Sequence, residues 1–389
     1  MTAAKSRSGK RQSVQTQLDF DPWLLGTMVA LLAIGLVMVS SASLHLLDDR
    51  PWYFTQRQLA YVAIGVLAGA MVSRIRLVWW ERWGGWLLGA VMAALVMVLI
   101  PGIGHEANGA QRWLDLVVVK FQVSELAKLA LIIYLAGYLT RRGQEVRSSA
   151  LGFFKPLLVA MLISALLLME PDFGAAVVIM ATAMVMAFIA GARLGYYLLS
   201  GLGVVAGLTV LAVTSPYRME RLTSFLNPWA DAQGSGYQLV QALIAIGRGE
   251  WLGVGLGSGV LKLHYLPEAH TDFVFAVLSE ELGFGGALVV IGLFTALVVR
   301  AFAIGIRAER NGAGFAAHLA FGIGIWLGMQ AFINIGVNLG VLPTKGITLP
   351  MISYGGSSMV VTCLALALLL RVDIESRQAG RQAARGVTR

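Results

Sequence analysis

The sequence predicts an all-α membrane protein with about ten transmembrane helices and one large periplasmic loop. Hydrophobic residues make up 57% of the 389 residues and charged residues only 13%, a balance that no single soluble core of this length needs. Apolar runs of the roughly 20 residues that a helix needs to cross a bilayer recur from Trp23 to the region of Leu370. Helices are expected because a helix satisfies its own backbone hydrogen bonds inside lipid.

The expected spans follow one another with short polar breaks. The first follows a basic, Ser/Gln-rich segment, 1–21, which we expect to be a disordered cytoplasmic tail. Its apolar stretch exceeds the roughly 7–15 residues of a signal peptide, so it is predicted to be an uncleaved anchor. The membrane domain, 22–371, is followed by a second basic tail, 372–389. The expected spans are 22–44, 57–73, 84–101, 120–139, 152–169, 173–191, 194–215, 273–300, 314–339 and 352–370.

Basic residues orient these spans. With the N-terminus in the cytoplasm, the inside loops contain Arg74, Arg141, Arg193 and Arg307, whereas the opposite short loops contain few basic residues. The positive-inside rule therefore places both termini in the cytoplasm. The net charge of +9 reflects this topology, and no nucleic acid is expected as a partner. The loop 216–272 is then the only long outer connection, and long loops are more often functional than idle.

Cysteine content limits the chemistry. Cys363 is the only cysteine and lies inside the last apolar run. A disulfide within the chain and a cysteine-rich metal site are therefore both excluded.

Charged residues within the spans are the most informative feature, because a charge at the bilayer centre costs about 2.5–3.5 kcal/mol even on lenient insertion scales. Ser124, Glu125 and Lys128 enter the span 120–139. Glu125 and Lys128 are three residues apart and share one helical face. They are candidates for substrate binding, with a structural ion pair as the alternative.

Further carboxylates lie at turns on the outer side. Glu170 and Asp172 flank a proline between two spans, where Asp172 is either a functional group or a helix cap. Asp272 lies where the long loop re-enters the membrane. A carboxylate that is partly removed from water but faces an aqueous cavity can accept a proton as a general base. An N-cap role is the alternative for Asp272.

Glu280 and Glu281 lie about two turns into the span 273–300. At least one of them is expected to face the bundle interior and a polar partner.

Polar groups also gather around the turn between the last two spans. Gly355 and Gly356 permit a close backbone approach or a helix break there, and packing through small residues is the alternative. The neighbouring polar residues are Asn334, Asn338, Lys345, Ser353, Tyr354, Ser357 and Ser358.

All these groups map to one side of the membrane under the predicted topology. The sequence therefore predicts an outward-facing polar cavity that can hold an anionic group such as pyrophosphate. Its expected members are Glu125, Lys128, Asp172, Asp272 and Lys345, with Arg112, Arg218, Arg221 and Lys262 nearby. The glycine-rich run 253–259 has the wrong spacing for a dinucleotide fingerprint and follows no strand pattern, and no Walker sequence is present.

Several motifs resemble the SEDS family (shape, elongation, division and sporulation), whose members are peptidoglycan glycosyltransferases. They are Asn227-Pro228-Trp229, Gly234-Ser235-Gly236-Tyr237-Gln238, Tyr265-Leu266-Pro267-Glu268-Ala269-His270-Thr271-Asp272-Phe273, Glu280-Glu281-Leu282-Gly283, Pro343-Thr344-Lys345-Gly346-Ile347-Thr348-Leu349-Pro350 and Ile352-Ser353-Tyr354-Gly355-Gly356-Ser357-Ser358. The resemblance covers nearly the whole chain from the first span to Arg377. One departure is Val123, where the family usually has proline, and it puts the local backbone in doubt.

Within the family, two stretches look like the division-type branch, FtsW, rather than the elongation-type branch, RodA. They are Lys345-Gly346-Ile347-Thr348 and Leu370-Arg371-Val372-Asp373-Ile374-Glu375-Ser376-Arg377. The resemblance implies that Asp272 matches the family's essential aspartate and that lipid II is the substrate. Substrate-binding candidates are then Ser124, Glu125, Lys128, Arg112, Trp113, Glu170, Asp172, Arg218, Arg221, His270, Thr271, Glu280, Lys345, Ser353, Gly355 and Gly356.

The expected reaction is an inverting displacement in which Asp272 takes a proton from the acceptor sugar while undecaprenyl pyrophosphate leaves. Lys128 and the loop arginines are candidates for stabilising that leaving group, and a divalent cation, Mg²⁺ or Mn²⁺, is a further candidate with no ligands assigned. The family implies a class B penicillin-binding protein of the FtsI type as partner at the division septum, with FtsQ, FtsL and FtsB as regulators. A lipid II flippase and an elongation-type polymerase are the alternatives, and a pure scaffold is a third class.

Overall fold

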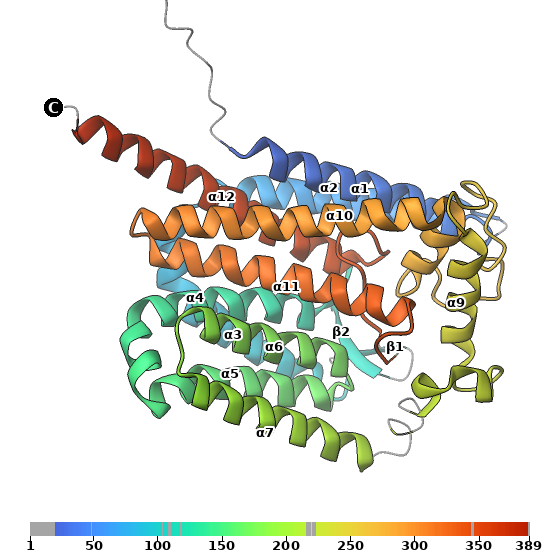
Figure 1. Cartoon of the computed structure of the whole chain (residues 1–389), viewed down its shortest axis with the longest axis horizontal. Coiled ribbons are helices and arrows are strands. Elements are labelled where there is room, and N and C mark those ends of the chain that lie inside the picture. The colour runs from blue at the N-terminus through green and yellow to red at the C-terminus, as the bar shows by residue number, and fades with distance from the viewer. Residues whose placement is uncertain are drawn as a thin grey trace, which may run out of the picture.

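The computed structural model describes residues 20–47, 49–102, 104–107, 110–116, 119–214, 219, 223–343 and 346–387. Helices dominate, and most lie side by side along one direction (Figure 1). The first seven long helices are α1 (Pro22–Ser43), α2 (Tyr53–Val72), α3 (Leu77–Val98), α4 (Val123–Ser148), α5 (Ala150–Met169), α6 (Phe173–Ile189) and α7 (Leu194–Val213). The later elements are a 3₁₀ turn, η1 (Pro228–Asp231), and the helices α9 (Tyr237–Gly249), α10 (Val274–Arg310), α11 (Gly314–Asn338) and α12 (Gly356–Val387).

Each of the ten expected spans coincides with a helix, although several ends differ. Seven helices of the described chain are long and apolar enough to cross a membrane: α1, α3, α4, α5, α10, α11 and α12. Shorter apolar helices, Phe173–Ile189 and Leu194–Gly207, match the spans 173–191 and 194–215. The remaining span, 57–73, corresponds to α2, whose apolar character is interrupted near its start by Arg57 and Gln58.

The chain is not entirely helical. A three-stranded antiparallel sheet, in the order β1 (Gly104–Ala107), β2 (Ala110–Leu116) and β3 (Val119–Gln122), connects α3 to α4. The expected span 120–139 therefore starts too early, because residues before Val123 pair with β2. Val123 is the first residue of α4. This first helical position is one that favours proline. The helix nevertheless starts there with valine, so the departure from the family pattern does not disrupt the local backbone.

The bundle exposes large apolar side chains on its outer faces and buries several polar side chains in its interior. Leu67, Leu202 and Val289 are exposed on the outer faces, whereas Glu281 and Asn338 are completely buried. Such an arrangement suits a lipid surround, because polar groups find partners only inside the bundle. Within it, α10 packs along α11, α12 along α2, and α3 along α4.

Ion pairs join the helices at the end where the described N-terminal segment begins. Asp21 caps α1 by accepting hydrogen bonds from the amides of Trp23 and Leu24, and it also forms an ion pair with Arg300 of α10. Arg307 of α10 pairs with Asp373 of α12. α12 continues to Val387, so much of the expected tail 372–389 is helical, whereas the tail 1–21 lies outside the described residues except for its last two.

The sheet, α9 and the connections around them lie at the opposite end of the bundle (Figure 1). α9 packs against α10 and η1, so the long loop 216–272 contains its own secondary structure. The sequence did not predict α9.

Candidate active site

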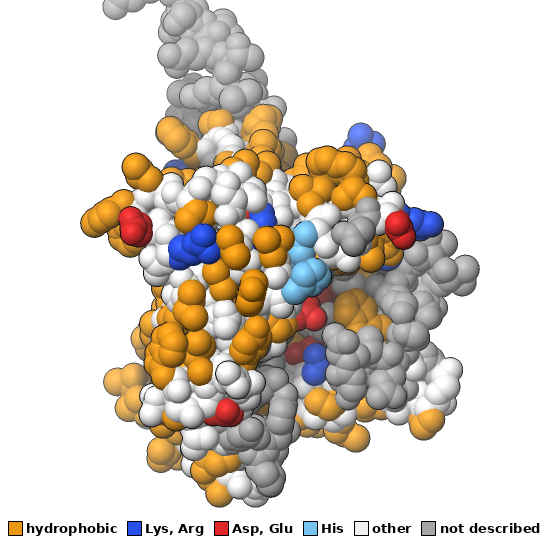
Figure 2. Space-filling view, turned by 90° about the vertical axis from the view of Figure 1, so that its right-hand side faces the viewer, with side chains coloured by type: hydrophobic (Ala, Val, Ile, Leu, Met, Phe, Trp, Pro, Cys, Tyr) orange, Lys and Arg blue, Asp and Glu red, His pale blue; other side chains and the backbone are white. Residues whose placement is uncertain are grey.

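The end of the bundle that carries the sheet is hollowed. Figure 2 shows acidic and basic side chains inside the hollow and histidines on its rim. Three connections contribute the candidate residues there: the turn 170–172, the end of the long loop at 268–273, and the segment 346–355 between α11 and α12.

Asp272 occupies the junction between the long loop and α10. It is half-buried, and the N-cap position of α10 belongs to Phe273, so the N-cap alternative for Asp272 is wrong. The backbone carbonyl of Asp272 accepts hydrogen bonds from Asn334 Nδ2 at 2.9 Å and from Asn338 Nδ2 at 3.1 Å. α11 therefore fixes the main chain from which the Asp272 carboxylate projects.

The segment 346–349 connects Asp272 to a second polar group. A β-carbon built on Gly346 would lie 3.1 Å from Asp272 Oδ2, so this segment passes directly beside the carboxylate. Asn334 donates to the carbonyl oxygen of Ile347 at 2.6 Å, and Gln330 donates to that of Thr348 at 3.1 Å. Gln330 also accepts a hydrogen bond from Lys128 Nζ at 2.9 Å.

Lys128 and Glu125 form a buried ion pair, with Nζ 2.8 Å from Oε1. The ammonium of Lys128 also lies 5.3 Å from the ring centre of Trp326. The other carboxylate oxygen of Glu125 has no hydrogen-bond partner among the described residues. Gln330 links this pair to the segment 346–349 through its hydrogen bonds to Lys128 and Thr348.

A third group joins β3, α4 and the turn 170–172. Gln122 Nε2 donates to Ser124 Oγ at 2.9 Å and to Asp172 Oδ2 at 3.2 Å. Asp172 also caps α6 by accepting from the amide of Ala175, so the helix-cap alternative is confirmed for this residue. Arg112 of β2 holds the same turn, because its guanidinium donates to the carbonyl oxygens of Glu170 and Pro171. Trp113, next to it, pairs with Gln122 across the sheet.

Glu170 is completely buried, and neither of its carboxylate oxygens has a hydrogen-bond partner among the described residues. Burial, and to a lesser extent the nearby Asp172 carboxylate, raise the pKa of this carboxyl to about 8, although Arg112 opposes the shift. Glu170 is therefore mostly protonated and uncharged at pH 7.

His270 and Thr271 precede Asp272 at the rim. The His270 ring packs against Phe54 and Tyr354, with ring centres 4.8 and 5.5 Å apart, and its carbonyl oxygen accepts from the amide of Tyr354 at 2.9 Å. Burial lowers the pKa of His270, which favours the neutral imidazole. Thr271 Oγ1 donates to Glu268 Oε2 at 2.6 Å.

Ser353, Gly355 and Gly356 shape the turn into α12. Ser353 Oγ accepts from the amide of Leu349 at 2.7 Å and tightens the segment. A β-carbon on Gly356 would lie 2.7 Å from the Tyr61 ring, so this glycine permits the close contact between α12 and α2. The packing alternative for Gly356 is confirmed.

Glu280 and Glu281 are not brought to the hollow. Glu280 accepts hydrogen bonds from the loop amides of Val260 and Leu261, and both glutamates are completely buried. Lys262, which was expected near the cavity, forms an ion pair with Glu281, and Glu280, which was expected to bind substrate, is instead bound by amides of the long loop. The expectation that at least one glutamate faces the interior and a polar partner is confirmed for both.

The glycine-rich run 253–259 supports these glutamates. Gly257 donates its amide to Glu281 at 3.0 Å, and a β-carbon on Gly253 would lie 2.1 Å from the Glu281 carbonyl oxygen. Gly253 has a φ of +81°, which disfavours other residues. The run is thus a close-packed backbone support and not a phosphate loop.

Three candidates, Arg218, Arg221 and Lys345, lie outside the described residues. Sequence reasoning missed Gln330, which joins Lys128 to the segment 346–349. The signal was present, because Gln330, Asn334 and Asn338 recur every four residues in an apolar span and so share one helical face. Within the part of the chain that the structure describes, no group of three or more His, Cys, Asp or Glu side chains could hold a metal.

Comparison with known proteins identifies the family of this chain. Residues 22–378 match the family model FTSW_RODA_SPOVE, described as "Cell cycle protein". The chain belongs to this family. The resemblance inferred from the motifs is thereby confirmed, and the family member is a helical integral membrane protein.

Individual relatives match nearly the whole chain. This chain is 56% identical over 360 residues to a protein of Nitrosococcus halophilus, and the match covers 92% of this chain and 93% of that one. It is 52% identical over 361 residues to a protein of Legionella pneumophila, covering 92% of each. Both relatives are described as "Probable peptidoglycan glycosyltransferase FtsW".

Two solved structures share the fold. One comes from work described as "Structural coordination of polymerization and crosslinking by a peptidoglycan synthase complex", with a TM-score of 0.77, 31% identity, and coverage of 93% of this chain and 99% of that one. The other is the rod shape determining protein RodA of Thermus thermophilus, with a TM-score of 0.68, 29% identity, and coverage of 92% and 97%.

Proposed function

We propose that this protein is a peptidoglycan glycosyltransferase that polymerises lipid II into glycan strands. One observation carries the proposal: Asp272 is half-buried beside the segment 346–349 and is held through its backbone by Asn334 and Asn338. Such a carboxylate can act as a general base, and relatives identical at more than half of the aligned residues are described as glycosyltransferases of this kind.

In the proposed reaction, the 4-hydroxyl oxygen of the acceptor sugar attacks the anomeric carbon of the lipid-linked donor. The hydroxyl proton passes to the Asp272 carboxylate. The bond between the anomeric carbon and the pyrophosphate oxygen breaks, its electron pair leaves with undecaprenyl pyrophosphate, and the α linkage becomes β. General-base assistance contributes about 10²–10⁴ in rate.

The leaving group carries negative charge that must be stabilised. We assign this role to Arg112, whose half-buried guanidinium holds the turn 170–172, and to the field of the buried Lys128. Arg218, Arg221 and Lys345 remain candidates from the sequence. The proposal routes no step through a metal.

We also propose that the protein acts at the division septum of the bacterial inner membrane, with both termini in the cytoplasm and the hollow facing the periplasm. Its proposed partner is a class B penicillin-binding protein of the FtsI type, regulated by FtsQ, FtsL and FtsB. Support comes from the basic residues at one end of the bundle and from a structural relative described within a synthase complex of polymerization and crosslinking.

The test uses purified full-length protein in liposomes that contain fluorescent lipid II, with and without the proposed partner. Glycan strands resolved on a gel are the expected product. Movement of labelled lipid II across the bilayer without any glycan would instead favour a flippase. In cells depleted of the native protein, restored septation supports the division role, and restored rod shape without septation favours the elongation-type role.

A further inference from the structure

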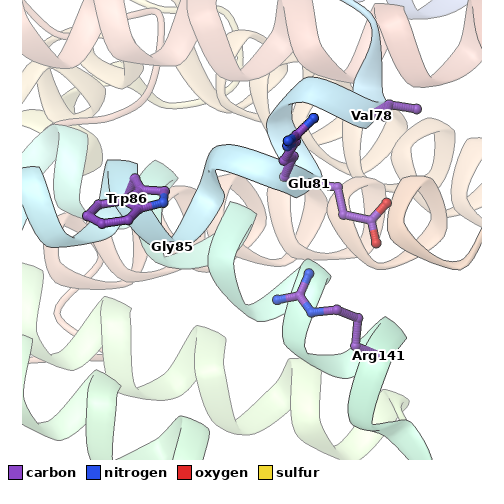
Figure 3. A pocket seen from close by; sticks show the side chains of 6 residues that line it. Val78, Glu81, Gly85, Trp86 and Arg141 are labelled. Carbon is purple, nitrogen blue, oxygen red and sulfur yellow. The ribbon is translucent and has the colours of Figure 1, made fainter.

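A pocket lies between α3 and α4 (Figure 3). Its volume is about 600 Å³, and it is lined by Val78, Glu81, Arg82, Gly85, Trp86 and Arg141. Arg141 is eighteen residues along α4 from Val123, which corresponds to about 27 Å of helix. The start of α3 contacts α12, because the amide of Leu77 donates to Glu375 at 3.1 Å. The pocket is therefore at the end of the bundle opposite the hollow.

The surface around this pocket has the composition of a membrane interface. Trp79, Trp83 and Trp86 are exposed on the first turns of α3, and Arg74 and Arg76 precede them. Tryptophans gather at the level of lipid headgroups, where an apolar ring and a polar N–H are both accommodated. Basic pockets between membrane helices on the cytoplasmic side are suited to lipid headgroups.

The charged groups of the pocket form no ion pair with any residue that the structure describes. Figure 3 shows the Glu81 and Arg141 side chains extending from α3 and α4 into the space between the two helices. Within the described chain, neither group forms an ion pair or hydrogen bond, and neither does Arg82. The neighbouring Arg142, by contrast, pairs with Glu145. Unpaired charges at a lipid boundary lose hydration, so a ligand of complementary charge would be stabilised there.

We propose that this pocket binds the phosphoethanolamine headgroup of a membrane phospholipid. Arg82 and Arg141 contact the phosphate, since guanidinium donors match phosphate oxygens, and Glu81 accepts hydrogen bonds from the primary ammonium. The acyl chains lie along Val78 and Trp86. An anionic headgroup without an amine would leave Glu81 unpaired beside a phosphate. A choline headgroup keeps the positive charge but has no N–H to donate.

Native mass spectrometry of the full-length protein with equal amounts of phosphatidylethanolamine, phosphatidylcholine and phosphatidylglycerol tests the proposal. We expect phosphatidylethanolamine to bind about fivefold more tightly than the other two, the scale of the net contribution of one typical hydrogen bond. Glu81→Gln should abolish that preference, and Arg141→Gln should weaken all three lipids. Arg310→Gln, an exposed charge at the end of α10, is the control and should change nothing.

A steric pair of variants tests the location without altering charge. β-Carbons on Gly85 and Gly89 would both meet open space, so leucine at either position is compatible with folding, but only Gly85 lines the pocket. Gly85→Leu should lower phosphatidylethanolamine binding about fivefold, whereas Gly89→Leu should not. Equal binding of the three lipids by the wild-type protein, a preference for phosphatidylglycerol, or an undiminished preference in Glu81→Gln would overturn the proposal.

Discussion

Asn334 holds Asp272 from a neighbouring helix, with its Nδ2 atom 2.9 Å from the Asp272 carbonyl oxygen. The same amide nitrogen also binds the carbonyl oxygen of Ile347, so one side chain sets the spacing between the long loop and the segment 346–349. The proposed base is thus positioned by α11 and not only by its own loop.

Asn334→Ala should therefore lower the turnover rate of lipid II polymerisation by about tenfold with little change in KM, because the carboxylate loses its alignment. The free energy of unfolding should fall by about 1–3 kcal/mol for the lost buried hydrogen bonds. Asn311→Ala is the matched control, since Asn311 Nδ2 donates to the Ser376 carbonyl oxygen at the other end of the bundle. Equal turnover by Asn334→Ala and wild type would contradict the positioning role.

The Glu125–Lys128 pair makes a prediction about stability. Lys128→Met should cost about 3–5 kcal/mol, because Glu125 would remain buried without its cation. The double variant Glu125→Gln/Lys128→Met should recover most of that loss in a thermal unfolding assay, yet not the polymerase activity. Arg142→Met, which removes an exposed pair with Glu145, should cost no more than about 1 kcal/mol. A double variant as unstable as Lys128→Met would show that the pair's charge is not the cause.

Apolar runs predicted the ten helices because span length is set by bilayer thickness, which the sequence reports directly. The sheet and α9 were missed because the strands are short and their pairing is a three-dimensional property. Asp272, Lys128 and Asp172 could be selected because a charge near a membrane needs a reason.

Glu280 and Lys262 were selected by the same reasoning, but the structure gives both side chains protein partners. The sequence identified buried charges but not their partners, and these two side chains are occupied by loop amides, Ser41 and Glu281. From the sequence alone, a buried charge that stabilises the fold cannot be distinguished from one that binds substrate, because the two differ only in their contacts.

The Glu281–Lys262 pair should anchor the long loop. Glu281 accepts hydrogen bonds from Ser41 of α1 at 2.7 Å and from the amide of Gly257 at 3.0 Å, so it ties the loop to both α1 and α10. Lys262→Met should increase hydrogen exchange of the loop amides 253–263, because the remaining carboxylate would be buried and unpaired. Glu250→Gln changes an exposed carboxylate nearby and should leave exchange unaltered. Unchanged protection in Lys262→Met would exclude the anchoring role.

Glu170 should make stability depend on pH. Its pKa rises from an ordinary 4.5 to about 8 in the folded protein, chiefly through burial. The folded state therefore keeps a proton that the unfolded state releases, and stability should fall as pH rises from about 4.5 to about 8. Glu170→Gln should flatten the melting temperature across this window, whereas the exposed Glu145→Gln should not. A wild-type curve as flat as that of Glu170→Gln would contradict a protonated Glu170.

The most direct test of the proposed chemistry is the polymerisation rate of purified lipid II by Asp272→Asn in liposomes. Asparagine keeps the shape but cannot take the proton, so the rate should fall by about 10²–10⁴ while the melting temperature stays within a few degrees of wild type. Glu309→Gln, an exposed carboxylate at the far end of α10, should polymerise at the wild-type rate. Glycan synthesis by Asp272→Asn at the wild-type rate would contradict the assignment of Asp272 as the general base.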